Sequence, residues 1–362
     1  MFDTLRTWTD RLLGRGSAAI TVPMMDGALK PNRVLDDAQV VATLPAVDDL
    51  ATDGHSLFFS AGRFVYRLQG EHCVEVARFD DDITALAAGH DGLFAVALGG
   101  HTVRVVRAPK WAEVARLETL GGQPLKSLNA LAFEGADRLL VSDGSNRRGP
   151  EQWAHDLMEH GRTGRVARWC FGGAGAAEAL AGGQHYAFGV LPLAGTVLHG
   201  ESWRHRVVST GANGREVLLA ELPGYPSRMA AASDGGFWLT CFVCRTQLVE
   251  FVLREDAYRE RMLAEIDPRY WIAPALSSGH SFLEPLQGAG VKSMGVLKPW
   301  APPHSYGLVL KVAADGRIVE SMHSQVDGKH HGITAVAEYG GALYAVSKGS
   351  GCLLRVAMGA QA

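Results

Sequence analysis

The stretch DDLATDGHSLFFS, residues 48–60, carries the pattern that decides the fold. A short run of alternating residues leads to a turn that contains Asp53 and Gly54, and a second alternating run follows. Alternation with a period of two is typical of a strand that buries one face, and Asp-Gly is a common turn between antiparallel strands. The stretch therefore predicts a β-hairpin.

The same plan recurs along the chain. Further copies are TALAAGHDGLFAV (84–96), NALAFEGADRLLVS (129–142), FGVLPLAGTVLH (188–199), SRMAAASDGGFWLT (227–240) and TAVAEYGGALYAV (334–346). Most copies continue with a third strand, and several with a fourth after a Gly turn. Six units of four short antiparallel strands predict an all-β, six-bladed β-propeller, because each sheet in a ring buries its faces against its two neighbours.

The ring must also close on itself. A strand around residues 34–44 precedes the first full unit, and the last unit ends near Met358 without room for a fourth strand. We therefore expect the N-terminal strand to complete the last blade. Because no linker divides the repeats, we expect a single propeller over residues 22–362, preceded by a helical extension at 1–21 with apolar residues at helical spacing.

Two segments interrupt the strand pattern. Residues 150–159 form a helical stretch, with Pro150 near its start and Gly161 after it. A longer insertion, 245–305, begins with a helical run at 246–266. Insertions of this kind shape binding sites on rigid scaffolds, so we expect both to cap one mouth of the ring.

Composition and charge limit the classes of partner. Among 362 residues, 35 are Lys or Arg and 38 are Asp or Glu, so the chain lacks the basic excess that binds nucleic acid. No stretch approaches the roughly 20 apolar residues of a membrane span. The odd count of five cysteines argues against a disulfide framework, and the single Cys-x-x-Cys at 241–244 fits a strand. We expect a cytoplasmic protein with a small-molecule partner, no nucleic acid and no membrane span.

Several ordered segments resemble strictosidine synthase-like proteins. They are MDGALKPNRVL (25–35), the run 129–145 followed by WAHDLMEHGRTGRV (153–166), LPGYP (222–226), DGGFW (234–238) and HGITAVAEYGGALY (331–344). The resemblance extends over residues 22–358 and implies a six-bladed propeller related to adipocyte plasma membrane-associated protein, paraoxonases and gluconolactonases. In that group, plant members catalyse a Pictet–Spengler condensation, whereas paraoxonase and gluconolactonase relatives hydrolyse esters or lactones with an axial divalent metal.

The start of each innermost strand faces the central channel of such a ring. Six side chains are expected there, with Arg228 beside the fifth: Asp48, Thr84, Asn129, Phe188, Ser227 and Thr334. We expect Asn129, Phe188, Ser227, Arg228 and Thr334 to contact a ligand. We take Asp48, Glu201 and His331 as candidate catalytic residues. Glu201 ends a second strand, where the relatives similarly carry a Glu, and His331 opens the last blade, where a histidine could act as a base because it titrates near neutrality.

A family-type metal site is expected to be incomplete here. Asp48 and Asn129 are oxygen ligands that a Ca²⁺ ion accepts, but Phe188 supplies none and Arg228 adds a positive charge. We therefore expect no cofactor, with Ca²⁺ at Asp48 and Asn129 as the alternative. The Arg228 guanidinium has two further interpretations: it pairs with Asp48 in place of a metal, or it holds a substrate carboxylate or phosphate.

Three functions remain open from the sequence. The first is hydrolysis of an ester or lactone, by a lactonase or arylesterase-like enzyme. The second is non-catalytic binding of a small anionic metabolite. The third is a condensing lyase, which is disfavoured because Thr334 stands where the condensing relatives carry a glutamate, and a Thr hydroxyl is no general base near neutral pH.

Overall fold

The computed structural model describes residues 22–173, 177–212, 214–278, 280, 292–293, 296–297 and 305–358. The predicted helical extension at 1–21 lies outside the described residues, as does most of the tract that follows the helices of the second insertion.

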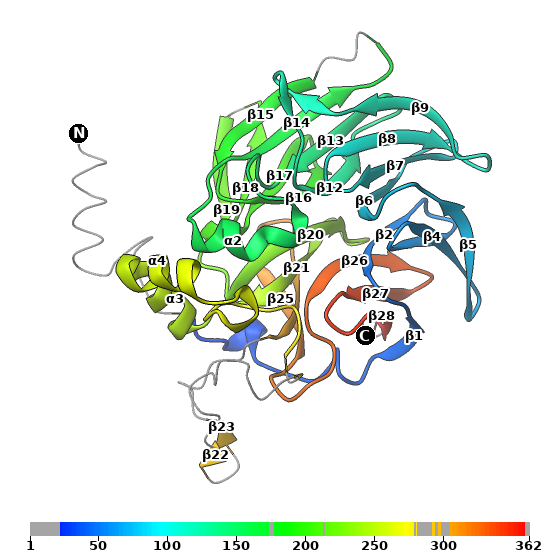
Figure 1. The fold of residues 1–362 in the computed structure, drawn as a ribbon. Coiled ribbons are helices and arrows are strands. Elements are labelled where there is room, and N and C mark those ends of the chain that lie inside the picture. Colours follow the sequence, from blue (N-terminus) through cyan, green and yellow to red (C-terminus); the bar gives the residue numbers. More distant parts are fainter. Residues whose placement is uncertain are drawn as a thin grey trace.

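Six four-stranded antiparallel sheets of the described chain stand around a common axis (Figure 1). Each sheet contributes one innermost strand, and each of these contacts the innermost strands of both neighbouring sheets, which closes the ring. The innermost strands are β2 (Val47–Thr52), β6 (Ile83–Ala88), β12 (Leu128–Phe133), β16 (Ala187–Leu193), β20 (Gly224–Ala231) and β26 (Ile333–Tyr339). The predicted all-β, six-bladed propeller is therefore confirmed.

The other strands follow outward in chain order within each blade, except in the last. Second strands are β3 (Leu57–Ala61), β7 (Leu93–Leu98), β13 (Arg138–Asp143), β17 (Thr196–Glu201), β21 (Phe237–Cys244) and β27 (Ala342–Ser347). Third strands are β4 (Phe64–Gln69), β8 (Thr102–Arg107), β14 (Gly164–Cys170), β18 (Arg206–Gly211), β24 (Gly307–Val312) and β28 (Cys352–Ala357). Outermost strands are β5 (His72–Arg78), β9 (Ala112–Leu117), β15 (Ala177–Gln184), β19 (Gly214–Leu219), β25 (Ile318–Ser324) and β1 (Gln39–Thr43).

The last blade combines both ends of the propeller. Its strands lie in the order β1, β28, β27 and β26, with Gln39 opposite Arg355 and Thr43 opposite Cys352. The N-terminal strand thus supplies the missing fourth strand, as expected. This pairing leaves the ring with no open edge between its first and last blades.

Apolar side chains fill the space between neighbouring blades. One such cluster joins the second and third blades through Leu128, Leu139 and Trp169, all at most 2% exposed. Near the axis the strands approach so closely that small residues are required. A Cβ atom added to Gly189 on β16 would lie 2.2 Å from the backbone oxygen of Ser227 on β20. This approach brings the start of β20 up to the axis.

Both predicted insertions contain helices. The first holds η3 (Pro150–Gln152) and α2 (Trp153–Met158), and the second holds α3 (Gln247–Arg254), α4 (Asp256–Glu265) and η5 (Pro268–Tyr270). The expected single helix at 246–266 is divided at Glu255, whose ψ of 78° lies outside the helical range. The Thr246 side chain accepts a hydrogen bond from the Val249 amide and so caps α3.

The remaining elements are short: η2 (Gly27–Leu29), η4 (Ser202–Arg204), and the strand pairs β10 (Thr119–Leu120) with β11 (Gln123–Pro124) and β22 (Lys292–Ser293) with β23 (Val296–Leu297). In the part of the chain that the structure describes, no helix is long and apolar enough to cross a membrane.

Candidate functional site

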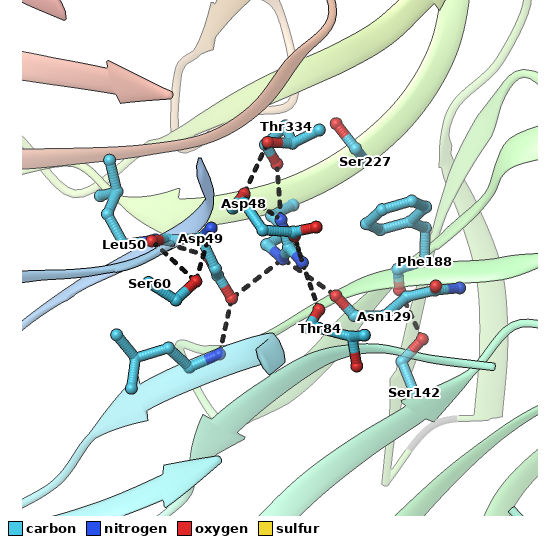
Figure 2. Close-up of polar contacts among 12 residues, drawn as sticks. Asp48, Asp49, Leu50, Ser60, Thr84, Asn129, Ser142, Phe188, Ser227 and Thr334 are labelled. Atoms are coloured by element: carbon cyan, nitrogen blue, oxygen red, sulfur yellow. Dashed lines mark hydrogen bonds and ion pairs between the residues drawn. The ribbon is translucent and has the colours of Figure 1, made fainter. Parts of the chain in front are cut away.

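The guanidinium of Arg228 occupies the centre of the ring. It belongs to β20 and donates to residues on the innermost strands of other blades, and Figure 2 labels these acceptor residues: Asp48, Thr84, Asn129 and Thr334. Nε lies 2.9 Å from the backbone oxygen of Asn129, and Nη1 lies 2.9 Å from that of Asp48 and 3.5 Å from that of Thr334. Nη2 lies 2.7 Å from Asp48 Oδ1 and 2.6 Å from the backbone oxygen of Thr84.

These contacts use every donor of the guanidinium. An arginine side chain carries five N–H groups, and five oxygen acceptors are in place around Arg228. Its flat face packs on Phe188, with the guanidinium carbon 5.5 Å from the ring centre. Of the two interpretations of Arg228, the structure provides the pairing with Asp48, and it leaves no N–H group for a substrate carboxylate or phosphate.

Asp48 lies between two cations. Its Oδ1 faces Arg228, and its Oδ2 accepts a hydrogen bond from Lys348 Nζ, which follows β27. Burial opposes ionisation of this carboxyl, but the charges of Lys348 and Arg228 outweigh it and lower the pKa of Asp48. The Asp48 carboxylate in turn raises the pKa of Lys348 against the effect of burial. Both groups are therefore charged at neutral pH.

A second carboxylate, that of Asp49, lies behind the first. Its Oδ2 is 3.0 Å from Arg228 Nε and accepts a hydrogen bond from the Leu86 amide at 2.8 Å. Its Oδ1 accepts another, from the Leu50 amide. Burial raises the pKa of Asp49 to about 6. Asp49 thus ties β2 to β6 and to Arg228 beneath the exposed part of the axis.

A small pocket, with a volume of about 50 Å³, opens above these charges. Its floor contains Asp48, Thr84, Asn129, Arg228, Thr334 and Lys348, and its walls contain Pro150, Glu151, Trp153, Tyr186, Phe188, Phe242 and Leu276. The first insertion therefore contributes directly to the pocket wall through η3 and α2.

Most of the expected ring residues meet in this pocket. Asn129 and Thr334 each fix a neighbouring strand, since Asn129 Nδ2 donates to the Ala187 oxygen at 2.9 Å and Thr334 Oγ1 donates to the Asp48 oxygen at 2.6 Å. Ser227 is different. Its hydroxyl lies 2.7 Å from Thr240 Oγ1 within the same blade and does not line the pocket.

Glu201 does not reach the pocket, contrary to expectation. It is buried at the end of β17, where it pairs with Arg206 and Arg215 and accepts a hydrogen bond from the His185 amide. Burial opposes ionisation, but these arginines lower the pKa of Glu201. Glu201 therefore lies on the second strand of blade four, where these ion pairs use its carboxylate within the protein.

His331 also lies outside the pocket, so its catalytic role stays a prediction that the axial pocket does not support. Its Nδ1 is 2.6 Å from Ser305 Oγ, and its Nε2 is 2.7 Å from the Gln325 backbone oxygen. Burial lowers its pKa, so the ring is neutral and both nitrogens are occupied within the protein. The residue therefore joins the start of the last blade to the preceding segments.

Several contributors to the site were not anticipated from the sequence, among them Lys348, Glu151 and Trp153. Lys348 lies in the turn after β27, and Glu151 and Trp153 come from the first insertion. A Lys that directly follows the second strand of a blade can be predicted to reach the axis only when the length of the turn after that strand is known. The aromatic residues of the insertion would equally suit a packed helix.

The residues at the axis do not fit a divalent cation. Asp48 and Asn129 were the candidate ligands, but the space between them holds the Arg228 guanidinium, and the second Asp48 oxygen holds Lys348. Two fixed positive charges repel a further cation. In addition, no group of three or more His, Cys, Asp or Glu among the described residues is arranged to hold a metal.

Comparison with known proteins shows which solved structures share the fold. No family model matches the chain, and no curated protein matches it by sequence. A solved gluconolactonase from Xanthomonas campestris superimposes with a TM-score of 0.58 at 12% identity, covering 92% of this chain and 94% of that one. The chain shares its propeller fold.

Two other solved structures agree with this result. Regucalcin from Agrobacterium tumefaciens, described as a calcium-binding protein, gives a TM-score of 0.55 at 11% identity, with 88% of this chain and 92% of that chain covered. A luciferin-regenerating enzyme gives a TM-score of 0.52 at 13% identity, with 90% and 94% covered. At these identities the likeness concerns the fold alone, and a specific relation to strictosidine synthase-like proteins stays a prediction.

Proposed function

We propose that the axial pocket binds a small molecule carrying an ester or a lactone and hydrolyses it without a metal ion. The observation that carries the proposal is the Lys348–Asp48 pair on the pocket floor. The Lys348 side chain is 27% exposed, and Asp48 Oδ2 is its one hydrogen-bond acceptor among the described residues. An ammonium carries three N–H groups, so two remain for a ligand.

The floor and walls suit such a substrate. Lys348 donates to the carbonyl oxygen and stabilises the negative charge that develops there when water attacks the carbonyl carbon. Asp48 accepts a hydrogen bond from that water and orients it. As the water oxygen bonds to the carbonyl carbon, its proton passes to the Asp48 carboxylate. The carbon–oxygen bond then breaks, and Asp48 returns that proton to the leaving alkoxide, which yields an acid and an alcohol from an ester, or one hydroxy acid from a lactone. Phe188, Phe242 and Trp153 pack against the apolar part of the substrate.

The fold shared with the Xanthomonas campestris gluconolactonase adds support, since a ring of this shape accommodates lactone chemistry in that protein. Arg228 has a positioning role in this proposal. It holds the Asp48 carboxylate by one oxygen and the backbone around it, and so fixes the direction in which the second oxygen meets Lys348.

One observation favours a second candidate, non-catalytic binding of a small carboxylate. The lowered pKa of Asp48 makes this carboxylate a weak base, so the pocket needs only Lys348 to hold an anion. A condensing activity receives less support, because the Thr334 hydroxyl is already used in a hydrogen bond to Asp48.

A panel of aryl esters and lactones, assayed with EDTA present, tests the proposal. We expect turnover by the wild-type protein and at least a roughly 100-fold lower kcat/KM for Lys348→Met, in line with loss of one oxyanion donor. The matched control is Lys311→Met, since Lys311 also pairs with an aspartate, Asp234, but lies outside the pocket. Absence of turnover, with carboxylate binding that Lys348→Met abolishes, would establish the second candidate instead.

A further inference from the structure

A second cavity, here called the rim cavity, lies away from the axis. Its volume is about 610 Å³, within the usual range for small-molecule sites. It is bounded by η4 and the start of β18 on one side and by α3 on the other, with Trp203, Arg204, Leu253 and Arg254 among its lining residues. Trp203 stacks on Tyr186, with ring centres 4.3 Å apart, and Tyr186 lines the axial pocket. The two cavities are thus separated by an aromatic pair.

Positive charge exceeds negative charge on one wall of this cavity. Arg206 pairs with Glu201, and Arg215 contacts the same carboxylate at 3.3 Å, so one buried carboxylate serves two arginines. Arg206 binds it through Nε and Nη2, which leaves Nη1 without a hydrogen-bond partner among the described residues. On the opposite wall, by contrast, the positive charge of Arg245 is neutralised, because Arg245 pairs there with two carboxylates, those of Glu250 and Glu221.

Arg204 adds a further cation beside Arg206. Its Nη2 lies 3.1 Å from His185 Nε2, and no described carboxylate lies within ion-pair distance of its guanidinium. Burial and the charge of Arg204 lower the pKa of His185 to about 4, so the imidazole is neutral and accepts this hydrogen bond. Burial and the charge of Arg206 lower the pKa of Arg204 itself. The guanidinium nevertheless stays charged at neutral pH.

We infer that the rim cavity binds the oxyanion group of a small molecule, a phosphate or a carboxylate, between Arg204 and Arg206. A planar guanidinium offers two parallel N–H donors to such a group. Trp203, Val217 and Leu253 provide apolar surface for the rest of the molecule. This site is separate from the proposed hydrolytic pocket and does not depend on the activity proposed there.

The geometry also leaves Arg204 without a carboxylate partner among the described residues. The Glu201 carboxylate is 2% exposed and fully engaged, so it is not available to Arg204. An anion in the cavity would offset the repulsion between Arg204 and Arg206. Because two guanidinium groups converge on one concave surface, the expected ligand is a compact oxyanion rather than an extended polyanion.

Titration of the full-length protein with inorganic phosphate and with phenyl phosphate, by calorimetry at neutral pH, tests this inference. We expect saturable binding with a dissociation constant on the order of 0.1–1 mM for phenyl phosphate and weaker binding for inorganic phosphate. Benzoate in a parallel titration separates carboxylate from phosphate ligands. Arg204→Gln should weaken the binding at least about tenfold, and Arg204→Lys by less, because it keeps the charge without the fork.

Two controls separate this site from other effects. Arg269→Gln removes an exposed arginine far from the cavity lining and should leave binding unchanged. Lys348→Met should also leave it unchanged, so that failure of the axial proposal and failure of this one are distinguishable. Non-saturable binding of all three anions, or equal binding by the wild-type protein and Arg204→Gln, would overturn the inference.

Discussion

Two arginines, Arg228 at the axis and Arg204 at the rim cavity, show opposite ways to place a cation in this propeller. Arg228 is 6% exposed and finds an acceptor for each of its five N–H groups. Arg204 is exposed, and its one hydrogen-bond partner among the described residues is a neutral histidine. The comparison teaches that residue type alone does not mark a binding site, because only a cation with unused donors has capacity for a ligand.

The strongest test of this comparison removes the axial cation. Arg228→Met removes the positive charge that pairs with the buried carboxylates of Asp48 and Asp49. We therefore expect the free energy of unfolding to fall by about 3–5 kcal/mol, as when one partner of a buried ion pair is removed in other proteins. Urea unfolding followed by tryptophan fluorescence measures it. The equivalent change at the rim, Arg204→Met, should alter stability far less, and equal losses at both positions would contradict the contrast.

Two threonines on innermost strands test how much hydrogen bonds at the axis contribute to stability. Thr334 Oγ1 donates to the Asp48 oxygen at 2.6 Å, whereas Thr84 Oγ1 is buried with no hydrogen-bond partner among the described residues. We expect Thr334→Val to cost about 1 kcal/mol of unfolding free energy and Thr84→Val to be neutral or stabilising. The same urea titrations report both. A larger loss at Thr84 would mean that its hydroxyl has a partner in solution.

Acidification tests the neutral histidine at the rim. The pKa of His185 is about 4 in the folded protein and near 6.5 when unfolded, so the unfolded chain binds the proton first as the pH falls. Protonation of His185 in the unfolded chain therefore lowers the free energy of unfolding as the pH falls from 6.5 to 4, by no more than about 1.4 kcal/mol per pH unit. Urea titrations at several pH values should show a smaller slope for His185→Asn. His90→Asn, an exposed control, should keep the wild-type slope.

The smallest expected effect is that of metal removal. Because the Arg228 guanidinium fills the space between Asp48 and Asn129, neither EDTA nor added Ca²⁺ should shift the thermal unfolding midpoint of the wild-type protein. Differential scanning fluorimetry with Mg²⁺ as a second cation measures this. A rise of several degrees that is specific to Ca²⁺ would show that the axial oxygens accept a metal in spite of Arg228.

The fold was predictable because it depends on local patterns. Alternating runs around Asp-Gly and Gly-Gly turns specify hairpins, and a missing fourth strand near Met358 required the strand at Gln39–Thr43 to complete the blade. The position of the helical run at 246–266 was predicted from the sequence, but its division into two helices was not. The break at Glu255 interrupts a continuous helical composition, and it depends on packing rather than on a Pro or Gly in the sequence.

The axial site was predictable only in part. Positions that repeat in every blade locate the ring, which is why Asp48, Asn129 and Arg228 meet as expected. Glu201 and His331 lie outside the axial pocket, where Arg206 and Ser305 bind their side chains, and the sequence pattern does not contain this placement. Lys348 was missed because its turn lies outside the repeated strand pattern. Side-chain direction in loops follows from tertiary contacts that spacing does not encode.

The pairing of β1 with β28 has a consequence for the order in which the molecule is made. Ribosomes release residues 39–43 early and residues 352–357 only after nearly all the rest. Until then, the first and last blades lack the sheet that seals them, and the strand at Gln39–Thr43 has no partner to pair with. Closure of the ring therefore requires the synthesis of residues 352–357, and a nascent chain stalled before Cys352 should remain sensitive to proteases at its unpaired edge.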